Sequence, residues 1–333
     1  MRAIRSLTVL TGFMAALAFP AGAASEYPAA ANHPAAAVHA TADHAAAADR
    51  CPQQTTAALA VDRSTLCVMI DDPAQGLEFD LVRNWIERSA RIVADYYAGF
   101  PAPLVVLRIH TAPRGAVGGG RTTNESGLVI QVSVGRGVTS SELAADWVLV
   151  HEMVHLALPE LGRRHNWLAE GLATYVEGIA RAQYGNRDVA DVWAEYRRSM
   201  PLGLPHPGEG GMDQTPTWGR TYWGGALYCL QSDVGIREQT GNRAGLQTAL
   251  RAILKETGGY RAERDIDDVL RIGDAATGTR VLQDLYRETK AKPLTPDLDL
   301  LWSRLGVPND PKSEPFDAHA PLSAIRIAIT RRP

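Results

Sequence analysis

Short apolar runs of the kind that form β-strands stand in the first part of the chain. Three of them are rich in Val, Ile and Leu: residues 66–70, 104–109 and 128–134. Runs of this length with many β-branched side chains predict strands, and the last one also shows partial apolar–polar alternation. Between the second and third runs, the glycine-rich residues 115–120 predict a turn.

Apolar positions spaced three and four apart predict helices, mostly in the second part of the chain. Residues 78–97 show this spacing, and the prolines that follow end it. A loop rich in Gly and Pro, residues 201–219, is expected over the site described below. The other predicted helices cover residues 167–181, 188–198, 219–240, 243–257, 263–272, 277–289 and 296–305, with a strand or short helix at 320–330. Strands with one helix, followed by many helices, indicate an α+β fold.

One predicted helix carries most of the candidate chemistry. Residues 140–142 read as its N-cap and first turn, an apolar stretch follows, and Pro159 ends it. His151, Glu152 and His155 on this helix form the pattern H-E-x-x-H. Residues four apart on a helix lie on one face, so both imidazoles can point at one Zn²⁺, while a catalytic site leaves one position to water. Glu152 lies one step round the helix and can reach that water without binding the metal.

A third metal ligand is expected from the next predicted helix. Glu170 lies fifteen residues after His155. Glu177 is two turns further on the same face, where it could orient a ligand by a hydrogen bond or remain an ordinary exposed carboxylate. His165 is the alternative third ligand, although a loop histidine of this kind is usually solvated. Residues 156–161 lack the Gly and His of the metzincin extension, which argues against that class.

At these residues the chain resembles the gluzincin peptidases of the MA clan, which have H-E-x-x-H on one helix and a Glu ligand on the next. Residues 167–177, WLAEGLATYVE, are similar to the W-L-x-E-G-x-A-x-Y-x-E segment of the M1 aminopeptidases and their M61 relatives. Residues 222–227, YWGGAL, are similar to their Y-x-K-G-A stretch, with Gly224 in place of the Lys. The residues Asp233, Arg237, Thr240 and Gly241 also match the M61-type helix.

The resemblance implies a zincin (thermolysin-like) catalytic domain with a small N-terminal mixed sheet and a mostly helical C-terminal lobe. It implies that His151, His155 and Glu170 bind Zn²⁺, that Glu152 is the general base and that Tyr222 stabilises the oxyanion. An alternative for Tyr222 is simple aromatic packing beside Trp218 and Trp223. In the zincin arrangement, the strand at 128–134 would line the cleft with a free edge, unless it is an ordinary internal strand.

The chain departs from these families in two places. The spacing from His155 to Glu170 is shorter than usual, which implies a trimmed loop between the two helices. The G-x-M-E-N segment that M1 enzymes use to hold a substrate's free amine is not present, and residues 118–125 occupy a similar distance upstream. The choice between aminopeptidase and endopeptidase specificity therefore stays open.

The N-terminus has the pattern of an export signal. Two arginines precede an apolar stretch at 7–19, and an A-x-A cleavage site follows at 21–23. We therefore expect a signal peptide at residues 1–23, an alanine-rich linker at 24–50, and a mature protein that is secreted or periplasmic. The folded part is expected to divide into an N-terminal α/β lobe with the H-E-x-x-H helix, residues 51–165, and a helical lobe with the third ligand, residues 166–333.

Net charge limits the possible binding partners, and the cysteines suggest one disulfide and one buried thiol. The formal net charge is −3, which favours neither nucleic acid nor an acidic membrane, and no later stretch is long and apolar enough to span a bilayer. Cys51 and Cys67, with a short helical or irregular segment between them, could form a disulfide in an exported protein. Cys229 is expected to be a small buried hydrophobe.

Together these features predict an exported zinc-dependent peptidase that acts on peptides or proteins, with Glu152 as general base. Two alternatives remain: aminopeptidase rather than endopeptidase specificity, and a non-catalytic zinc-containing binding module. A closed structural zinc site carries four protein ligands and usually Cys, whereas only three ligands are evident here.

Overall fold

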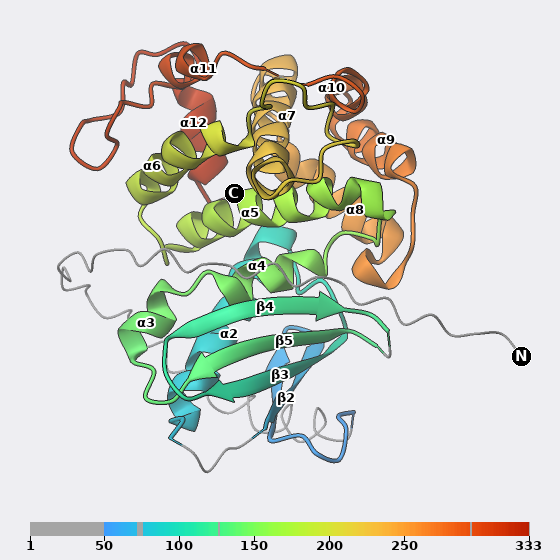
Figure 1. Ribbon diagram of the computed structural model, residues 1–333, viewed down its shortest axis with the longest axis vertical. Helices are drawn as coiled ribbons and strands as arrows, with labels where there is room; N and C mark the ends of the chain where they lie inside the picture. The colour runs from blue at the N-terminus through green and yellow to red at the C-terminus, as the bar shows by residue number, and fades with distance from the viewer. Residues whose placement is uncertain (1–49, 72–75, 126, 294, 333) are drawn as a thin grey trace, which may run out of the picture.

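A mixed β-sheet occupies one end of the molecule and a group of helices the other in the computed structural model (Figure 1). It describes residues 50–71, 76–125, 127–293 and 295–332; the predicted signal peptide and residues 24–49 of the predicted linker lie outside them. Within that part of the chain the sheet has five strands in the order β1-β2-β3-β5-β4. The strands are β1 (Ala57–Val61), β2 (Ser64–Ile70), β3 (Leu104–Ala112), β4 (Val117–Thr123) and β5 (Val129–Gly135).

Pairing directions make the sheet mixed. β1 and β2 form an antiparallel hairpin, and β2, β3 and β5 run parallel to one another. The helix α2 (Phe79–Tyr97) connects β2 to β3, as a parallel pair requires. β4 pairs antiparallel with β5 at the other side of the sheet. The three predicted strands and this helix are therefore confirmed.

Two expectations about the sheet are wrong. The segment between Cys51 and Cys67 contains strand β1 rather than a helical or irregular stretch, because the small apolar residues of β1 pair with β2. The glycine-rich stretch 115–120 is a turn only in part, since β4 begins at Val117 and carries its glycines within the ladder, with a register shift between Val117 and Gly120. Glycine has weak strand propensity, so sequence alone pointed to a turn.

The position of β4 also corrects the expectation for the strand at 128–134. β5 lies between β3 and β4 and is an internal strand, whereas β4 is at the edge of the sheet. The free edge next to the H-E-x-x-H helix therefore belongs to β4.

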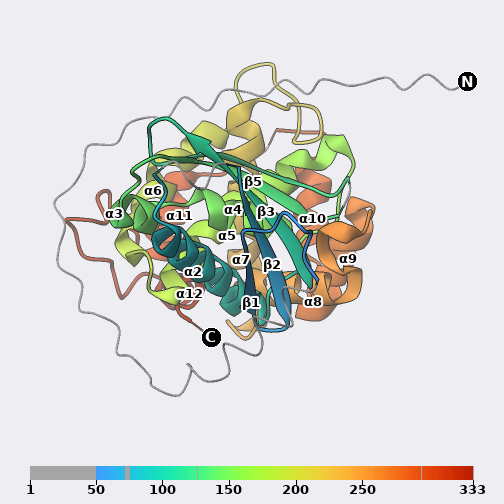
Figure 2. The ribbon, with the colours of Figure 1, turned by 90° about the horizontal axis from the view of Figure 1, so that it is seen from below.

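The helices build two layers on one face of the sheet. Those after β5 are α3 (Ser140–Ala145), α4 (Val148–His155), α5 (Asn166–Tyr184), α6 (Val189–Ser199), α7 (Gly225–Thr240), α8 (Leu246–Thr257), α9 (Ile266–Thr277), α10 (Val281–Thr289), α11 (Leu298–Leu305) and α12 (Ser323–Thr330). Helices α2 and α4 contact each other and the sheet, and α5 packs against α4 and α7 (Figures 1 and 2). This arrangement confirms the predicted α+β class and places α4 between the sheet and the helical layer.

The predicted helix that starts at residue 140 is interrupted. Thr139, not residues 140–142, caps α3, which ends at Ala145. The Asp146 carboxylate then accepts hydrogen bonds from the N–H groups of Val148 and Leu149, at 3.0 and 3.2 Å, and from the Trp85 indole at 2.9 Å. Asp146 thus caps α4 and ties it to α2, so the H-E-x-x-H helix has its own start.

Among the described residues, no helix is both long enough and apolar enough to cross a membrane.

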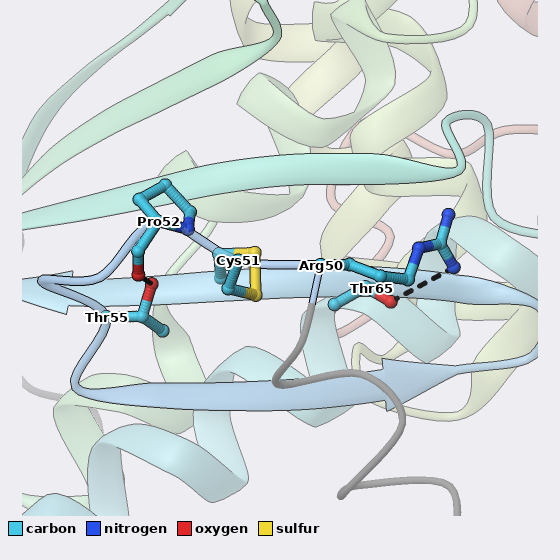
Figure 3. The surroundings of a disulfide bond; sticks show 6 residues. Arg50, Cys51, Pro52, Thr55 and Thr65 are labelled. Atoms are coloured by element: carbon cyan, nitrogen blue, oxygen red, sulfur yellow. Dashed lines mark hydrogen bonds between the residues drawn. A yellow bond between two sulfur atoms is a disulfide. The ribbon is translucent and has the colours of Figure 1, made fainter.

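A disulfide between Cys51 and Cys67 fastens the start of the described chain to β2 (Figure 3). Nearby, the Thr55 hydroxyl donates to the Pro52 carbonyl at 2.6 Å and Arg50 donates to Thr65 at 3.5 Å. The pairing left open by the sequence is therefore present. Cys229 is free and buried in α7, and burial raises the pKa of its thiol, as expected for a cysteine that serves as packing.

The disulfide gives a direct test. We expect alkylation of the denatured, unreduced protein to label one cysteine and alkylation after reduction to label three. Replacing both Cys51 and Cys67 with Ala should lower the free energy of unfolding by about 3 kcal/mol, because the closed loop restricts the unfolded chain. Urea titrations measure that loss; labelling of three thiols without reduction would contradict the disulfide.

Candidate metal centre

Two helices bring three metal-binding side chains together. His151 and His155 project from α4, and Glu170 comes from α5. The Nε2 atoms of His151 and His155 lie 3.3 and 3.5 Å from Glu170 Oε2, and all three candidate ligand atoms lie within 4.8 Å of one another. These side chains are mostly buried. Among the described residues they form the group that could hold a metal ion.

The spacing of the ligand atoms fits a zinc ion. Two atoms bound to Zn²⁺ at ~2.0–2.1 Å in a tetrahedron stand roughly 3.4 Å apart. The two measured His–Glu separations, 3.3 and 3.5 Å, agree with that value. Two imidazoles and one carboxylate are also a known ligand set for catalytic zinc, with a fourth position left for water.

Electrostatics in the group favour the charged carboxylate. Burial alone would raise the pKa of Glu170, but the nearby His155 and hydrogen bonds from both imidazoles lower this pKa far below its ordinary value. Burial likewise opposes protonation of His155, yet the Glu170 carboxylate raises the pKa of that imidazole. An ionised carboxylate is the form that binds a metal.

A close helix crossing sets the position of Glu170. A Cβ atom on Gly171 would overlap the backbone of Gly225, and one on Gly225 would overlap Gly171 and the Trp167 carbonyl. The two glycines therefore let α5 and the start of α7 approach backbone to backbone. Glu170 is adjacent to this crossing. The connection from α4 to α5 is short and ends in a 3₁₀ turn at Arg163–His165.

Glu152 is held by the edge strand rather than by the helices. The Thr122 hydroxyl lies 2.7 Å from Glu152 Oε2 and 2.9 Å from the Glu152 carbonyl oxygen, so it can donate to either. Gly120, two residues earlier on the same face of β4, leaves the space that the Glu152 side chain occupies, since a Cβ there would overlap it. Sequence reasoning missed both residues, although a glycine inside a strand can mark such a close approach.

Tyr222 lies beside the group of three. It belongs to a π-helix (Arg220–Gly224), and its ring stacks on that of His151 with centroids 6.3 Å apart. Burial raises the pKa of Tyr222, as do the charges of Glu170 and Glu152 and a hydrogen bond to Glu170. The phenol is therefore protonated at neutral pH and can donate. The Trp218 ring also stacks on Tyr222, with centroids 5.8 Å apart, so Tyr222 has an aromatic packing role as well.

His165 does not join the three ligand residues. The Tyr286 hydroxyl lies 3.2 Å from His165 Nε2, and Asp213 lies 3.5 Å from the same nitrogen. Asp213 also accepts a hydrogen bond from Trp167 at 2.9 Å. The expectation of a solvated loop histidine is therefore wrong, because residues far along the chain cover it.

Glu177 also differs from both expectations. Its carboxylate is buried and accepts a hydrogen bond from Arg181 at 2.7 Å, with Arg187 3.8 Å away. Arg181 in turn donates to the carbonyls of Ala144 and Ala145 at the end of α3. Glu177 is thus part of a buried ion pair that joins α5 to α3, neither an exposed carboxylate nor a partner of the metal ligands.

Asp233 and Arg237, two of the residues that resemble the M61-type helix, belong to a buried hydrogen-bond network. Asp233 accepts hydrogen bonds from Arg237 at 2.7 Å, from the Leu246 amide at 3.0 Å and from the Tyr175 hydroxyl at 3.0 Å. This buried network joins α5, α7 and α8. It holds α7, and with it the crossing at Gly225, in place.

Comparison with known proteins adds information about the fold. No family model matches the chain, and no curated protein matches it. Among solved structures, an aminopeptidase N family protein from Idiomarina loihiensis is similar over 74% of this chain and 48% of its own, with a TM-score of 0.54 and 11% identity. An M1 zinc metallopeptidase from Deinococcus radiodurans matches over 73% of this chain and 52% of its own, with a TM-score of 0.47 and 16% identity.

This chain therefore spans about half the length of the structures it matches. At such low sequence identities the similarity shows a shared fold alone, the fold of an aminopeptidase N family protein.

Proposed function

We propose that this protein is an exported zinc-dependent peptidase. The observation that carries the proposal is the convergence of His151, His155 and Glu170 from two helices, with Glu152 of the same H-E-x-x-H turn beside them. The fold shared with an aminopeptidase N family protein supports the same chemistry. The Cys51–Cys67 disulfide supports export to a secreted or periplasmic location, since such bonds persist in oxidising compartments.

His151, His155 and Glu170 would hold the zinc ion. When bound there, zinc acidifies a water molecule and polarises the carbonyl of the bond to be cleaved. The ionised Glu170 compensates part of the charge of the ion, and burial of the three side chains keeps their geometry fixed.

Glu152 would serve as the general base. Its carboxylate accepts a proton from the attacking water and passes it to the nitrogen of the leaving amine. The Thr122 hydroxyl holds Oε2 at 2.7 Å, and the space beside Gly120 lets the carboxylate lie against β4. Tyr222, protonated and adjacent to Glu170, would donate to the oxygen that becomes negative as water adds.

The edge strand would align the substrate. Within the described part of the chain β4 pairs with β5 on one side only, so its outer row of backbone groups can pair with an extended peptide. The strand carries Gly120 and Thr122, the two contacts of Glu152, and an aligned backbone would therefore lie close to the base.

Cleavage of matched peptides with free and with blocked amino termini distinguishes an aminopeptidase from an endopeptidase.

Metal content tests the ligand set. We expect the purified protein to bind one equivalent of zinc and Glu170→Ala to lose most of it, since two imidazoles alone make an incomplete site. His165→Gln should keep the zinc, because His165 contacts Asp213 and Tyr286 instead. Elemental analysis after dialysis measures both, and retention of a full equivalent in Glu170→Ala would assign the third ligand elsewhere.

Glu152→Gln separates metal binding from catalysis. The variant should keep its zinc and lower kcat by at least about 100-fold, because the amide cannot accept the proton. Glu160→Gln removes an exposed carboxylate eight residues along and should leave kcat unchanged. Peptide hydrolysis with and without a chelator provides the readout. Wild-type activity in the Glu152 variant would contradict the proposed mechanism.

Gly120→Ala tests the role of the edge strand. The added methyl group would overlap the Glu152 side chain and displace it, and a shift of about 1 Å can lower kcat by about 100-fold. Gly119→Ala is a matched control, since a Cβ there meets open space. We expect zinc content to be unchanged in both variants. Equal kcat in the two would show that β4 does not position the base.

A further inference from the structure

A row of aromatic rings runs through the site. In order of contact it consists of Trp218, Tyr222, His151 and Trp147. Tyr222 stacks on Trp218 at 5.8 Å and on His151 at 6.3 Å, and Trp147 contacts His151 edge-on at 5.6 Å. The inner two rings are the ones assigned to the reaction. The outer two, the tryptophans, have no role in the mechanism above.

Both tryptophans expose a large apolar surface. Trp218 is 52% exposed and Trp147 is 39% exposed, whereas His151 is buried. Leu202, also 52% exposed, packs its backbone against Gly219, the residue that follows Trp218. Single exposed apolar residues are normal on a protein surface, but the two tryptophans contact His151 and Tyr222 rather than being scattered.

The local chain explains why the tryptophans are held in this position. Trp147 is the residue before α4, in the segment that the Asp146 cap fixes. Trp218 precedes the π-helix that carries Tyr222, and Gly219 allows the close approach of the Leu202 carbonyl. The rings are therefore attached to the same elements that position His151 and Tyr222.

We infer that Trp147 and Trp218 form apolar subsites for the substrate, so that the enzyme selects peptides with bulky hydrophobic side chains next to the cleaved bond. This inference rests on the peptidase function proposed above. Covering an exposed indole with an apolar side chain removes a large area from water. Aromatic faces also attract cations, so a preference for a basic side chain is the outcome that the test below must distinguish from an apolar one.

The test uses two series of peptides, one varied on each side of the cleaved bond, with Phe, Leu, Ala or Lys at the varied position. We expect wild type to cleave the Phe and Leu peptides about tenfold or more better than the Ala peptide, measured as kcat/KM. Trp147→Ala and Trp218→Ala should each bring that ratio toward one at the position they contact, and Trp218→Phe should keep part of it. Phe79→Ala, which removes an exposed ring at the start of α2, should leave the ratio unchanged.

Several outcomes would overturn the inference. Equal cleavage of the four peptides, or a preference for Lys, would overturn it as a whole. An unchanged ratio in a tryptophan variant that is folded by circular dichroism and binds zinc would overturn the role of that ring.

If wild type cleaves no peptide, the proposed function fails and the subsites are tested by binding. Titration of Glu152→Gln with the Phe and Ala peptides, followed by tryptophan fluorescence, should then show tighter binding of Phe that Trp218→Ala removes. Equal binding would overturn the subsites independently of catalysis.

Discussion

The site depends on the backbone contact between α5 and the start of α7. At Gly171 and Gly225 the two helices are too close for any side chain larger than hydrogen. This contact places Glu170, next to Gly171, against the π-helix that holds Tyr222. Helix α4 then packs on α5 and brings His151 and His155 within 3.5 Å of the same carboxylate oxygen. A larger residue at Gly171 or Gly225 would push the two helices apart and separate the metal ligands from Tyr222, even with all of these side chains still present.

The sheet contributes a different part of the site. Glu152 belongs to the H-E-x-x-H helix, but its carboxylate is held by Thr122 of the edge strand and lies in the space beside Gly120. The metal ligands thus come from helices, and the orientation of the base comes from β4. A buried carboxylate needs such a partner because charge is costly to remove from water. The same contact explains the glycine at position 120 of β4 despite the weak strand propensity of glycine, since a Cβ there would overlap the Glu152 side chain.

Where the sequence was misread, contacts between distant residues decided the structure. Periodicity and capping preferences located the three interior strands and most helices, because those signals lie within a few residues of one another. His165 was expected to be a solvated loop residue or the alternative third ligand, yet Tyr286 and Asp213 cover it. Glu177 was expected to orient a metal ligand or to be an exposed carboxylate, yet it is buried against Arg181. Asp146 interrupts a helix that the apolar pattern continues, since its carboxylate caps α4 while also binding Trp85.

The sequence by itself determined the spacing of the candidate ligands, because two histidines four apart on a helix share a face whatever surrounds them. It also placed Glu170 on the following helix, and so indicated the composition of the metal group. Only the tertiary structure decided that β4 rather than β5 is the edge strand, that Thr122 holds Glu152, and that Trp147 and Trp218 extend the row of rings at His151. These features join residues far apart in the chain, and their contacts follow from how the sheet and helices pack rather than from any local pattern.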